Sequence, residues 1–186
     1  MDLVKKQEEA VIDNEFCNVY INSVIVKECH ARITGLITTP DNYIELFKLL
    51  NRIDEDDNMT VHINSPGGDM DTAIEIMTAI KICKAPVTTE ISGVAHSCAG
   101  LIFLSGHKYR LHSFSSMMCH YYTGFLYGKG HEIKTQSEFD DKFCRNFFNK
   151  SYKGFLTQKE INELINGKDF YFASDEIERR LNLRTK

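Results

Sequence analysis

A serine on a turn of small residues is the most chemically suggestive feature of this sequence. The segment from Gly93 to Gly100 (GVAHSCAG) places Ser97 just before an apolar helix that we expect over residues 98–105. The dipole and unpaired amides of a helix N-terminus stabilise developing negative charge, and small neighbours let a substrate carbonyl approach. Ser97 could therefore be a nucleophile, although a serine at this position could equally cap the helix.

A serine nucleophile needs a base, and His120 has the most suggestive setting of the seven histidines. It ends a strand-like segment, Ser116 to His120, whose period-two pattern places Met118 and His120 on one face. His96 adjoins Ser97, but adjacent strand or turn residues usually point in opposite directions, which argues against it. Spacing alone does not separate a catalytic His120 from a structural one.

A pair of glycines lies between another expected strand and the helix that follows it. The segment from Ile63 to Asp69 (INSPGGD) contains Gly67 and Gly68, which can adopt backbone angles denied to other residues and expose their amides to a ligand. Without further context, a tight turn explains such a pair equally well.

The strands and helices that we expect around these residues alternate along the chain. This alternation predicts an α/β architecture with a largely parallel sheet and right-handed crossovers. The expected strands are residues 19–26, 31–37, 59–63, 87–92, 108–112 and 116–120, and the expected helices are 43–53, about 70–82, 98–105, 131–154, 159–165 and 174–181.

The length and composition are those of one ordinary globular domain. The chain has 186 residues, is 42% hydrophobic and carries a net charge of -4, which disfavours nucleic acid as a partner. We expect a charged, mobile arm over residues 1–15 and a single domain over 16–186. No apolar run reaches the roughly 18 residues of a membrane span, and the charged N-terminus does not resemble a signal peptide, so we expect a cytoplasmic protein.

The cysteines and histidines do not indicate a bound metal or cofactor. The six cysteines are scattered without a C-x-x-C pair, which disfavours both a zinc site and a disulfide framework. The histidines lack ligand spacing, and nothing calls for a nucleotide or organic cofactor. We therefore expect catalysis, if present, to use side chains and backbone amides alone.

The helix expected over residues 131–154 is largely charged yet carries four phenylalanines. Phe139, Phe143, Phe147 and Phe148 recur near helical spacing and need a covering surface. A long helix with such a stripe is more often an oligomer contact than part of a cofactor site, and we favour that interpretation over packing within one chain.

Three motifs in the same order carry a resemblance to a known family. INSPGG, GVAHSCAG and MMCH resemble the turn, nucleophile and base motifs of the proteolytic subunit of Clp protease (ClpP). The resemblance spans roughly Val19 to Leu183 and includes the segment beginning at Phe172. It implies a crotonase-like ClpP fold, built from ββα spiral units, in which the helix over 131–154 is a projecting handle that joins two rings.

The resemblance also implies a serine endopeptidase. In this sequence Ser97 would be the nucleophile and His120 the general base, and the amides of Gly68 and Cys98 would form the oxyanion hole. The substrate would be a peptide or unfolded protein, cleaved inside a homo-oligomeric, ring-like compartment.

The third member of the catalytic triad has two candidates. Counting forward from His120 favours Asp169, whereas counting back from Phe172 falls near Asn166. An asparagine could orient the imidazole but would stabilise an imidazolium less than a carboxylate does. Lys168 would suit a serine–lysine pair, as in the related signal peptide peptidase A family, but we expect a lysine on this polar loop to be solvated.

One departure from the family bears on partners, and other functions stay open as alternatives. Thr60 and His62 replace aromatic residues that help form the family's docking sites for an AAA+ unfoldase, which disfavours that partner. A phage-type prohead or self-processing protease and a non-catalytic ClpP-like structural or regulatory subunit are the alternatives. Acyl-CoA chemistry, which also uses paired amides on a crotonase-like fold, ranks last because it does not need the serine–histidine pair.

Overall fold

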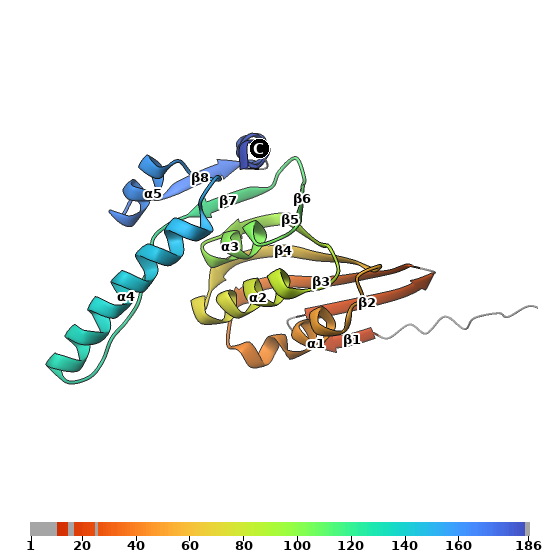
Figure 1. Ribbon diagram of the computed structural model, residues 1–186, viewed down its shortest axis with the longest axis horizontal. Helices are drawn as coiled ribbons and strands as arrows, with labels where there is room; N and C mark the ends of the chain where they lie inside the picture. The colour runs from red at the N-terminus through yellow and green to blue at the C-terminus, as the bar shows by residue number, and fades with distance from the viewer. Residues whose placement is uncertain (1–10, 15–16, 25, 185–186) are drawn as a thin grey trace, which may run out of the picture.

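The computed structural model describes the backbone of residues 11–14, 17–24 and 26–184, and the side chains from Glu28 to Arg184. Within these residues eight strands form one mixed sheet in the order β1-β2-β3-β4-β5-β7-β8, with β6 also paired to β5 (Figure 1). The strands are β1 (Val11–Asn14), β2 (Cys17–Val24), β3 (Val26–Ile37), β4 (Asn58–Gly68), β5 (Val87–His96), β6 (Lys108–Leu111), β7 (Ser116–Cys119) and β8 (Phe170–Ala173).

The centre of the sheet is parallel and its two ends are antiparallel. β3, β4 and β5 run parallel to one another, and β6 and β7 both run parallel to β5. β1–β2, β2–β3 and β7–β8 are antiparallel pairs. The sheet is therefore less uniformly parallel than the strand–helix alternation predicted, because consecutive strands β1, β2 and β3 pair antiparallel at one end and β8 pairs antiparallel with the distant β7 at the other.

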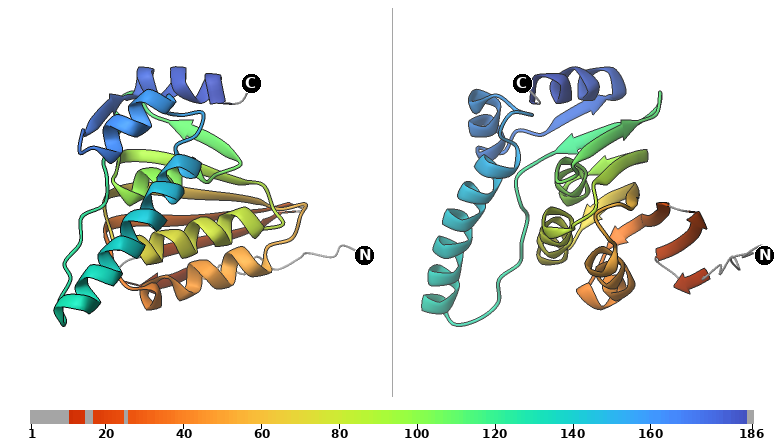
Figure 2. Two further views of the ribbon diagram at one scale, coloured as in Figure 1. Left: turned by 60° about the vertical axis from the view of Figure 1, so that its left-hand side comes forward. Right: turned by 45° about the vertical axis from the view of Figure 1, so that its right-hand side comes forward.

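The helices that follow β3, β4 and β5 cover one face of the sheet. α1, α2 and α3 lie side by side on that face (Figure 2). The helical elements are η1 (Pro40–Tyr43), α1 (Ile44–Arg52), α2 (Met70–Ile82), α3 (Cys98–Leu104), α4 (Gly130–Ser151), α5 (Gln158–Ile165) and α6 (Ser174–Arg184). All six expected helices are present, with shifts of a few residues at their ends.

The core lies between this helical layer and the sheet. Met59, Val61 and Ile63 alternate along β4 and are fully buried, and they belong to the same cluster as Ile76 and Ile80 of α2. Because strand side chains alternate, the residues between them face the other side of the sheet. That opposite face is polar at the strands that lead toward the candidate site.

A buried glutamate organises the polar face. The Glu90 carboxylate is 5% exposed and lies 2.8 Å from His62 Nδ1, 3.0 Å from His112 Nε2 and 2.9 Å from Arg110. Burial alone would raise the pKa of Glu90, but the hydrogen bonds from His112, His62 and Arg110 lower this pKa to about 2. His62 is thus hydrogen-bonded to Glu90 within a network of polar and charged side chains on this face of the sheet.

The N-terminal arm expected over residues 1–15 falls only partly on described residues. Residues 11–14 form β1, which pairs with β2 through Val11 opposite Tyr20 and Ile12 opposite Val19. This part of the expected arm therefore belongs to the sheet, since a hairpin return gives its backbone a neighbouring strand to pair with. Residues 1–10 and 15 lie outside the described residues.

The helix that carries the phenylalanines projects from the body of the molecule. The N-terminal end of α4 lies away from the body, and its C-terminal end reaches the body near α5 (Figures 1 and 2). Phe139, Phe143 and Phe147 stack along it with successive ring centroids 6.1 Å apart. Phe148, in contrast, is 3% exposed and packs on Tyr121 and Tyr152. The predicted stripe is thus divided between an exposed side and the core.

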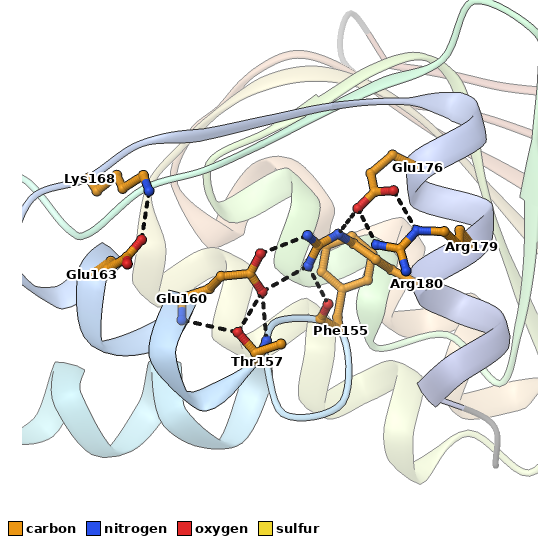
Figure 3. Close-up of polar contacts among 8 residues, drawn as sticks. All are labelled: Phe155, Thr157, Glu160, Glu163, Lys168, Glu176, Arg179 and Arg180. Atoms are coloured by element: carbon orange, nitrogen blue, oxygen red, sulfur yellow. Dashed lines mark hydrogen bonds and ion pairs between the residues drawn. The ribbon is translucent and has the colours of Figure 1, made fainter.

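A network around Arg180 ties the C-terminal elements together. The Arg180 guanidinium of α6 donates to both carboxylate oxygens of Glu160, at 2.7 and 3.0 Å, and to Glu176 (Figure 3). The same guanidinium lies 4.4 Å from the ring centroid of Phe172 in β8. Thr157 and Glu160 form the predicted capping box at the start of α5. These contacts fix α5, β8 and α6 relative to one another.

Candidate active site

Ser97 lies on a strained turn between β5 and α3. Its φ of 56° and ψ of -131° place it in the left-handed half of backbone space, and it is the one non-glycine residue with positive φ in the described part of the chain. A serine on a strained strand-to-helix turn presents its hydroxyl to a substrate, and such strain persists where the surroundings hold it. Ser97 occupies the N-cap position of α3, but its side chain makes no capping hydrogen bond, so the alternative in which its hydroxyl caps the helix does not hold.

Strand pairing brings His120 to this serine. β5 and β7 are neighbours through the pair His96 and Met118, and the Ser97 amide donates to the Met118 carbonyl at 2.9 Å. His120 follows β7 directly, and its Nε2 lies 2.7 Å from Ser97 Oγ. The two side chains are therefore within hydrogen-bond distance, which is the geometry that proton transfer from the hydroxyl requires.

His96 faces away from this pair. Its Nε2 lies 3.2 Å from Ser116 Oγ, and burial lowers the pKa of its imidazole. The alternation of side chains along β5 explains why a histidine adjacent to the serine in sequence is not its partner.

The two glycines at the end of β4 allow the chain to pass close to the serine. Gly67 has φ 99°, and a Cβ there would lie 2.6 Å from the Cβ of Ser97. Gly68 has φ 147°, and a Cβ there would lie 2.1 Å from the Ile37 carbonyl oxygen. Both positions thus exclude a side chain, for steric as well as conformational reasons.

Gly68 and Cys98 lie next to the serine–histidine pair. Both line a cavity of about 60 Å³ that Ser97 and His120 also line. Asp69, the next residue after Gly68, caps α2 by accepting from the Thr72 amide at 2.8 Å. Burial raises the pKa of the Cys98 thiol to about 11, so this thiol stays protonated near neutral pH and does not compete with Ser97 as a nucleophile.

Asp169 lies beside His120 but is not bonded to it. β7 and β8 pair through Cys119 and Phe170, so His120 and Asp169 are the residues that continue this antiparallel pairing just beyond the two strand ends. The Asp169 side chain is exposed, and among residues 28–184 it makes no hydrogen bond. The structure therefore places Asp169 at the register position that follows on from this pairing, without a hydrogen bond to the His120 imidazole.

The two alternatives to Asp169 are Asn166 and Lys168, and both make their contacts with residues of α5 or β8. Asn166 is the exposed C-terminal cap of α5, and its amide donates to the Asn162 carbonyl at 3.2 Å. Lys168 Nζ lies 2.6 Å from a Glu163 carboxylate oxygen and 4.9 Å from the Phe170 ring centroid. The Lys168 ammonium, which we expected to be solvated, is thus on the surface and paired with Glu163.

The family follows from a match that covers most of the chain. A family model described as Clp protease matches residues 15–176. The chain belongs to the Clp protease family. Its α/β fold is the crotonase-like fold of that family, in agreement with the resemblance of its three motifs.

Individual Clp protease relatives match over shorter segments. The chain is 35% identical over 97 residues to the chloroplastic ATP-dependent Clp protease proteolytic subunit 3 of Arabidopsis thaliana, covering 51% of this chain and 31% of that protein. It is 29% identical over 97 residues to the ATP-dependent Clp protease proteolytic subunit of Chlorella vulgaris, covering 51% and 48%. It is also 32% identical over 59 residues to the chloroplastic proteolytic subunit-related protein 2 of Arabidopsis thaliana, covering 32% and 21%. The chain thus spans less than half the length of each.

Sequence reasoning missed the residues that form the rest of the cavity wall. Tyr121, Tyr122 and Phe148 line it, and the two tyrosine rings meet edge to face with centroids 4.9 Å apart. Tyr121 and Tyr122 gave no sequence signal beyond following His120 directly, and Phe148 was noted only as part of the phenylalanine stripe.

Within residues 28–184, no group of three metal-ligating side chains comes together. None of the described helices has the length and apolar character that a membrane crossing requires.

Proposed function

We propose that this protein is a serine endopeptidase that hydrolyses peptide bonds through Ser97 and His120. The observation that carries the proposal is the 2.7 Å separation of Ser97 Oγ and His120 Nε2 on a strained strand-to-helix turn. The two residues are distant in sequence, and a polar contact between them needs β5 and β7 to be neighbours. Membership of the Clp protease family supports the same activity.

The first step is acylation of the serine. His120 Nε2 takes the Ser97 hydroxyl proton while Oγ forms a bond to the substrate carbonyl carbon. The carbonyl electron pair moves to oxygen, and the resulting oxyanion would lie by the amides of Gly68 and Cys98, each such donor being worth about 3 kcal/mol in the transition state. The carbon–nitrogen bond then breaks, and His120 delivers its proton to the departing amine.

Water completes the reaction. His120, neutral again, takes a proton from water, and the hydroxide oxygen bonds to the acyl carbon. The ester bond to Ser97 breaks, and the proton returns from His120 to Oγ. Asp169 would serve as the third member by stabilising the imidazolium, provided that it moves into contact with the ring when substrate binds.

Labelling of the nucleophile tests the proposal. A fluorophosphonate probe should modify Ser97 of the intact protein, and Ser97→Ala should abolish both the labelling and peptide hydrolysis, leaving at most the background rate. His120→Ala should also lose labelling, because the hydroxyl then has no base. A Ser105→Ala variant, which removes the hydroxyl at the opposite end of α3, is the matched control and should label normally. Absence of labelling in the wild-type protein would contradict the proposal.

A non-catalytic Clp-like subunit is the second candidate. The observation that favours it is the exposed Asp169 carboxylate without a hydrogen bond to His120. The serine–histidine contact weighs against it, since a purely structural subunit would not need these two groups aligned. The labelling experiment separates the two candidates directly.

The assembly, the partners and the compartment are part of the proposal. A homo-oligomeric, ring-like particle with a peptide or unfolded-protein substrate fits the family and the exposed stripe of α4. An AAA+ unfoldase is a disfavoured partner, since Thr60 and His62 replace aromatic docking residues and His62 is bonded to the buried Glu90. We propose a cytoplasmic protein that acts on peptides without a metal or cofactor.

A further inference from the structure

We propose that Ser65 is a positioning residue for the oxyanion hole, because its buried hydroxyl holds the turn that presents the Gly68 amide to the substrate. The inference rests on the proposed peptidase function and assigns a role to a residue that does not line the cavity beside Ser97. Removing this hydroxyl should therefore slow the chemical step and leave substrate binding nearly unchanged.

Strand β4 departs from regular pairing around Ser65 and Pro66. On the β3 side, Asn64 and Gly67 are three residues apart, whereas their partners in β3 are two residues apart. A second register shift, on the β5 side, falls between Ile63 and Ser65. Such a bulge interrupts the ladder of hydrogen bonds and is common next to active sites. Buried backbone groups in this segment therefore need partners other than the neighbouring strands.

The Ser65 hydroxyl supplies such a partner. Its Oγ accepts a hydrogen bond from the Gly67 amide at 3.1 Å, and the side chain is 0% exposed. A serine that binds the amide two residues further along the chain closes a local turn. The intervening Pro66 has a restricted φ and no amide hydrogen of its own. One buried side-chain oxygen thus closes the turn that leads into the glycine pair.

Gly68 lies between two anchored residues. On one side the Gly67 amide is bonded to Ser65, and on the other the Asp69 amide donates to the Ile37 carbonyl at 2.8 Å. Gly68 itself is exposed and lines the cavity beside the serine–histidine pair. Glycine has no side chain to restrict its backbone, so the orientation of its amide is set by these two neighbours.

The same turn also supports the nucleophile. Gly67 packs so closely against Ser97 that a Cβ on the glycine would lie 3.1 Å from Ser97 Oγ and 2.8 Å from the His96 carbonyl oxygen. A displacement of Gly67 would therefore change the distance between the attacking oxygen and the oxyanion donor. A misplacement of about 1 Å costs about 10²-fold in rate, and loss of a whole oxyanion donor costs about 10²-fold to 10³-fold. Because the Asp69 anchor remains, we expect a smaller effect from Ser65.

Steady-state kinetics on Ser65→Ala tests the inference. On a fluorogenic peptide amide we expect kcat to fall by about 10-fold to 100-fold, with KM within about 3-fold of the wild-type value. A peptide aldehyde gives a second readout, since Ser97 Oγ bonds to its carbon, His120 takes the hydroxyl proton and the carbonyl electron pair moves to oxygen. Because this adduct resembles the transition state, its inhibition constant should rise by the same factor as kcat/KM falls.

Ser115→Ala is the matched control. Ser115 is another buried serine, 3% exposed, whose hydroxyl accepts from the His112 amide at 3.0 Å and donates to the Ile91 carbonyl at 2.7 Å. It does not line the cavity beside Ser97. Both variants should lower the urea midpoint of unfolding, whereas only Ser65→Ala should lower kcat. Equal losses of kcat in the two variants would reveal a general effect of stability and overturn the inference.

Ser65→Cys separates the hydrogen bond from packing. The thiol fills the space of the hydroxyl but accepts hydrogen bonds only weakly, so we expect the same loss of kcat as in Ser65→Ala. A Ser65→Cys protein with wild-type kcat, or a Ser65→Ala defect that appears only in KM, would overturn the positioning role while Ser97-dependent cleavage leaves the peptidase function intact. Absence of both cleavage and fluorophosphonate labelling in the wild-type protein would overturn the peptidase function and the inference with it.

Discussion

Ser97 is held in its unusual conformation by contacts on three sides. Its amide donates to the Met118 carbonyl at 2.9 Å, its carbonyl accepts from the Gly100 amide at 3.0 Å, and its Cβ approaches the backbone at Gly67 closely enough to exclude a side chain there. Backbone strain of this kind costs about 1–3 kcal/mol and persists only where the surrounding structure over-determines it. The same contacts that hold the strain also hold the hydroxyl at His120.

The identity of the third triad residue is decided by comparing Asp169 with Asn166. Asp169→Asn should lower kcat for hydrolysis of a fluorogenic peptide by about 10³-fold to 10⁴-fold, because the imidazolium loses its carboxylate and the ring its preferred tautomer. Asn166→Ala is the matched control and should stay within a few fold of wild type, since this residue caps α5. Steady-state kinetics on the two purified variants makes the measurement. The reverse ranking would assign the role to Asn166.

A helix or strand could be predicted closely when the residues that indicate it lie within its own segment of the sequence. The helices carried apolar periodicity within their own sequence, and Thr157 with Glu160 gave a start signal for α5, so these elements were predicted closely. β8 has only four residues, Phe170–Ala173, and exists because β7 provides an antiparallel neighbour. Such a pairing between distant segments leaves no periodic trace in either one.

The residues of the candidate site also fall into two groups: those that could be predicted from their own short segment, and those that depend on contacts between distant segments. The nucleophile, the base and the glycines could be recognised because each lies in a short segment with its own residue pattern. The sequence could not predict whether Asp169 bonds to His120, since this depends on the conformation of the loop between α5 and β8. The cavity walls were missed because they combine α2, α3, α4 and the residues after β7.

The Arg180 network makes α5 and α6 sensitive to acid. Hydrogen bonds from Arg180 hold the pKa of Glu160 at about 2, below its ordinary value of 4.5. A depressed pKa adds to the free energy of unfolding above the ordinary value, and this contribution is lost as the pH falls from about 4.5 to about 2. Glu160→Gln should therefore lower the unfolding free energy at pH 7 by about 1–2 kcal/mol, with the difference from wild type narrowing toward pH 2.

Urea denaturation at several pH values between neutral and pH 2 measures this effect. Glu163→Gln is the matched control on the same helix, because it breaks the more exposed ion pair with Lys168, for which we expect less than about 1 kcal/mol. A Glu160→Gln deficit that stays constant down to pH 2 would show that packing, and not the charge, is what the substitution removes.

At the scale of the whole molecule, α4 projects from the body and carries exposed aromatic side chains. Phe139 is 62% exposed and Phe143 is 42% exposed, on a helix that projects from the body (Figure 1). Stacked aromatic rings on a projecting surface favour association over solvation. Ser97, His120 and Asp169, in contrast, all belong to one chain, so an interface on α4 would build the compartment without supplying the proposed catalytic groups.

Charge placed on the stripe should disassemble the particle. Phe143→Glu buries a carboxylate in any contact formed by the stripe, so native mass spectrometry should show a shift of at least half of the particles to a smaller oligomer. Ser137→Glu puts the same charge on an exposed position of α4 roughly 120° around the helix from Phe143, and it should leave the mass unchanged. An unchanged mass for Phe143→Glu would mean that the stripe is not the contact. A smaller particle that still binds the fluorophosphonate probe would show that assembly and nucleophile activation are separate properties of the chain.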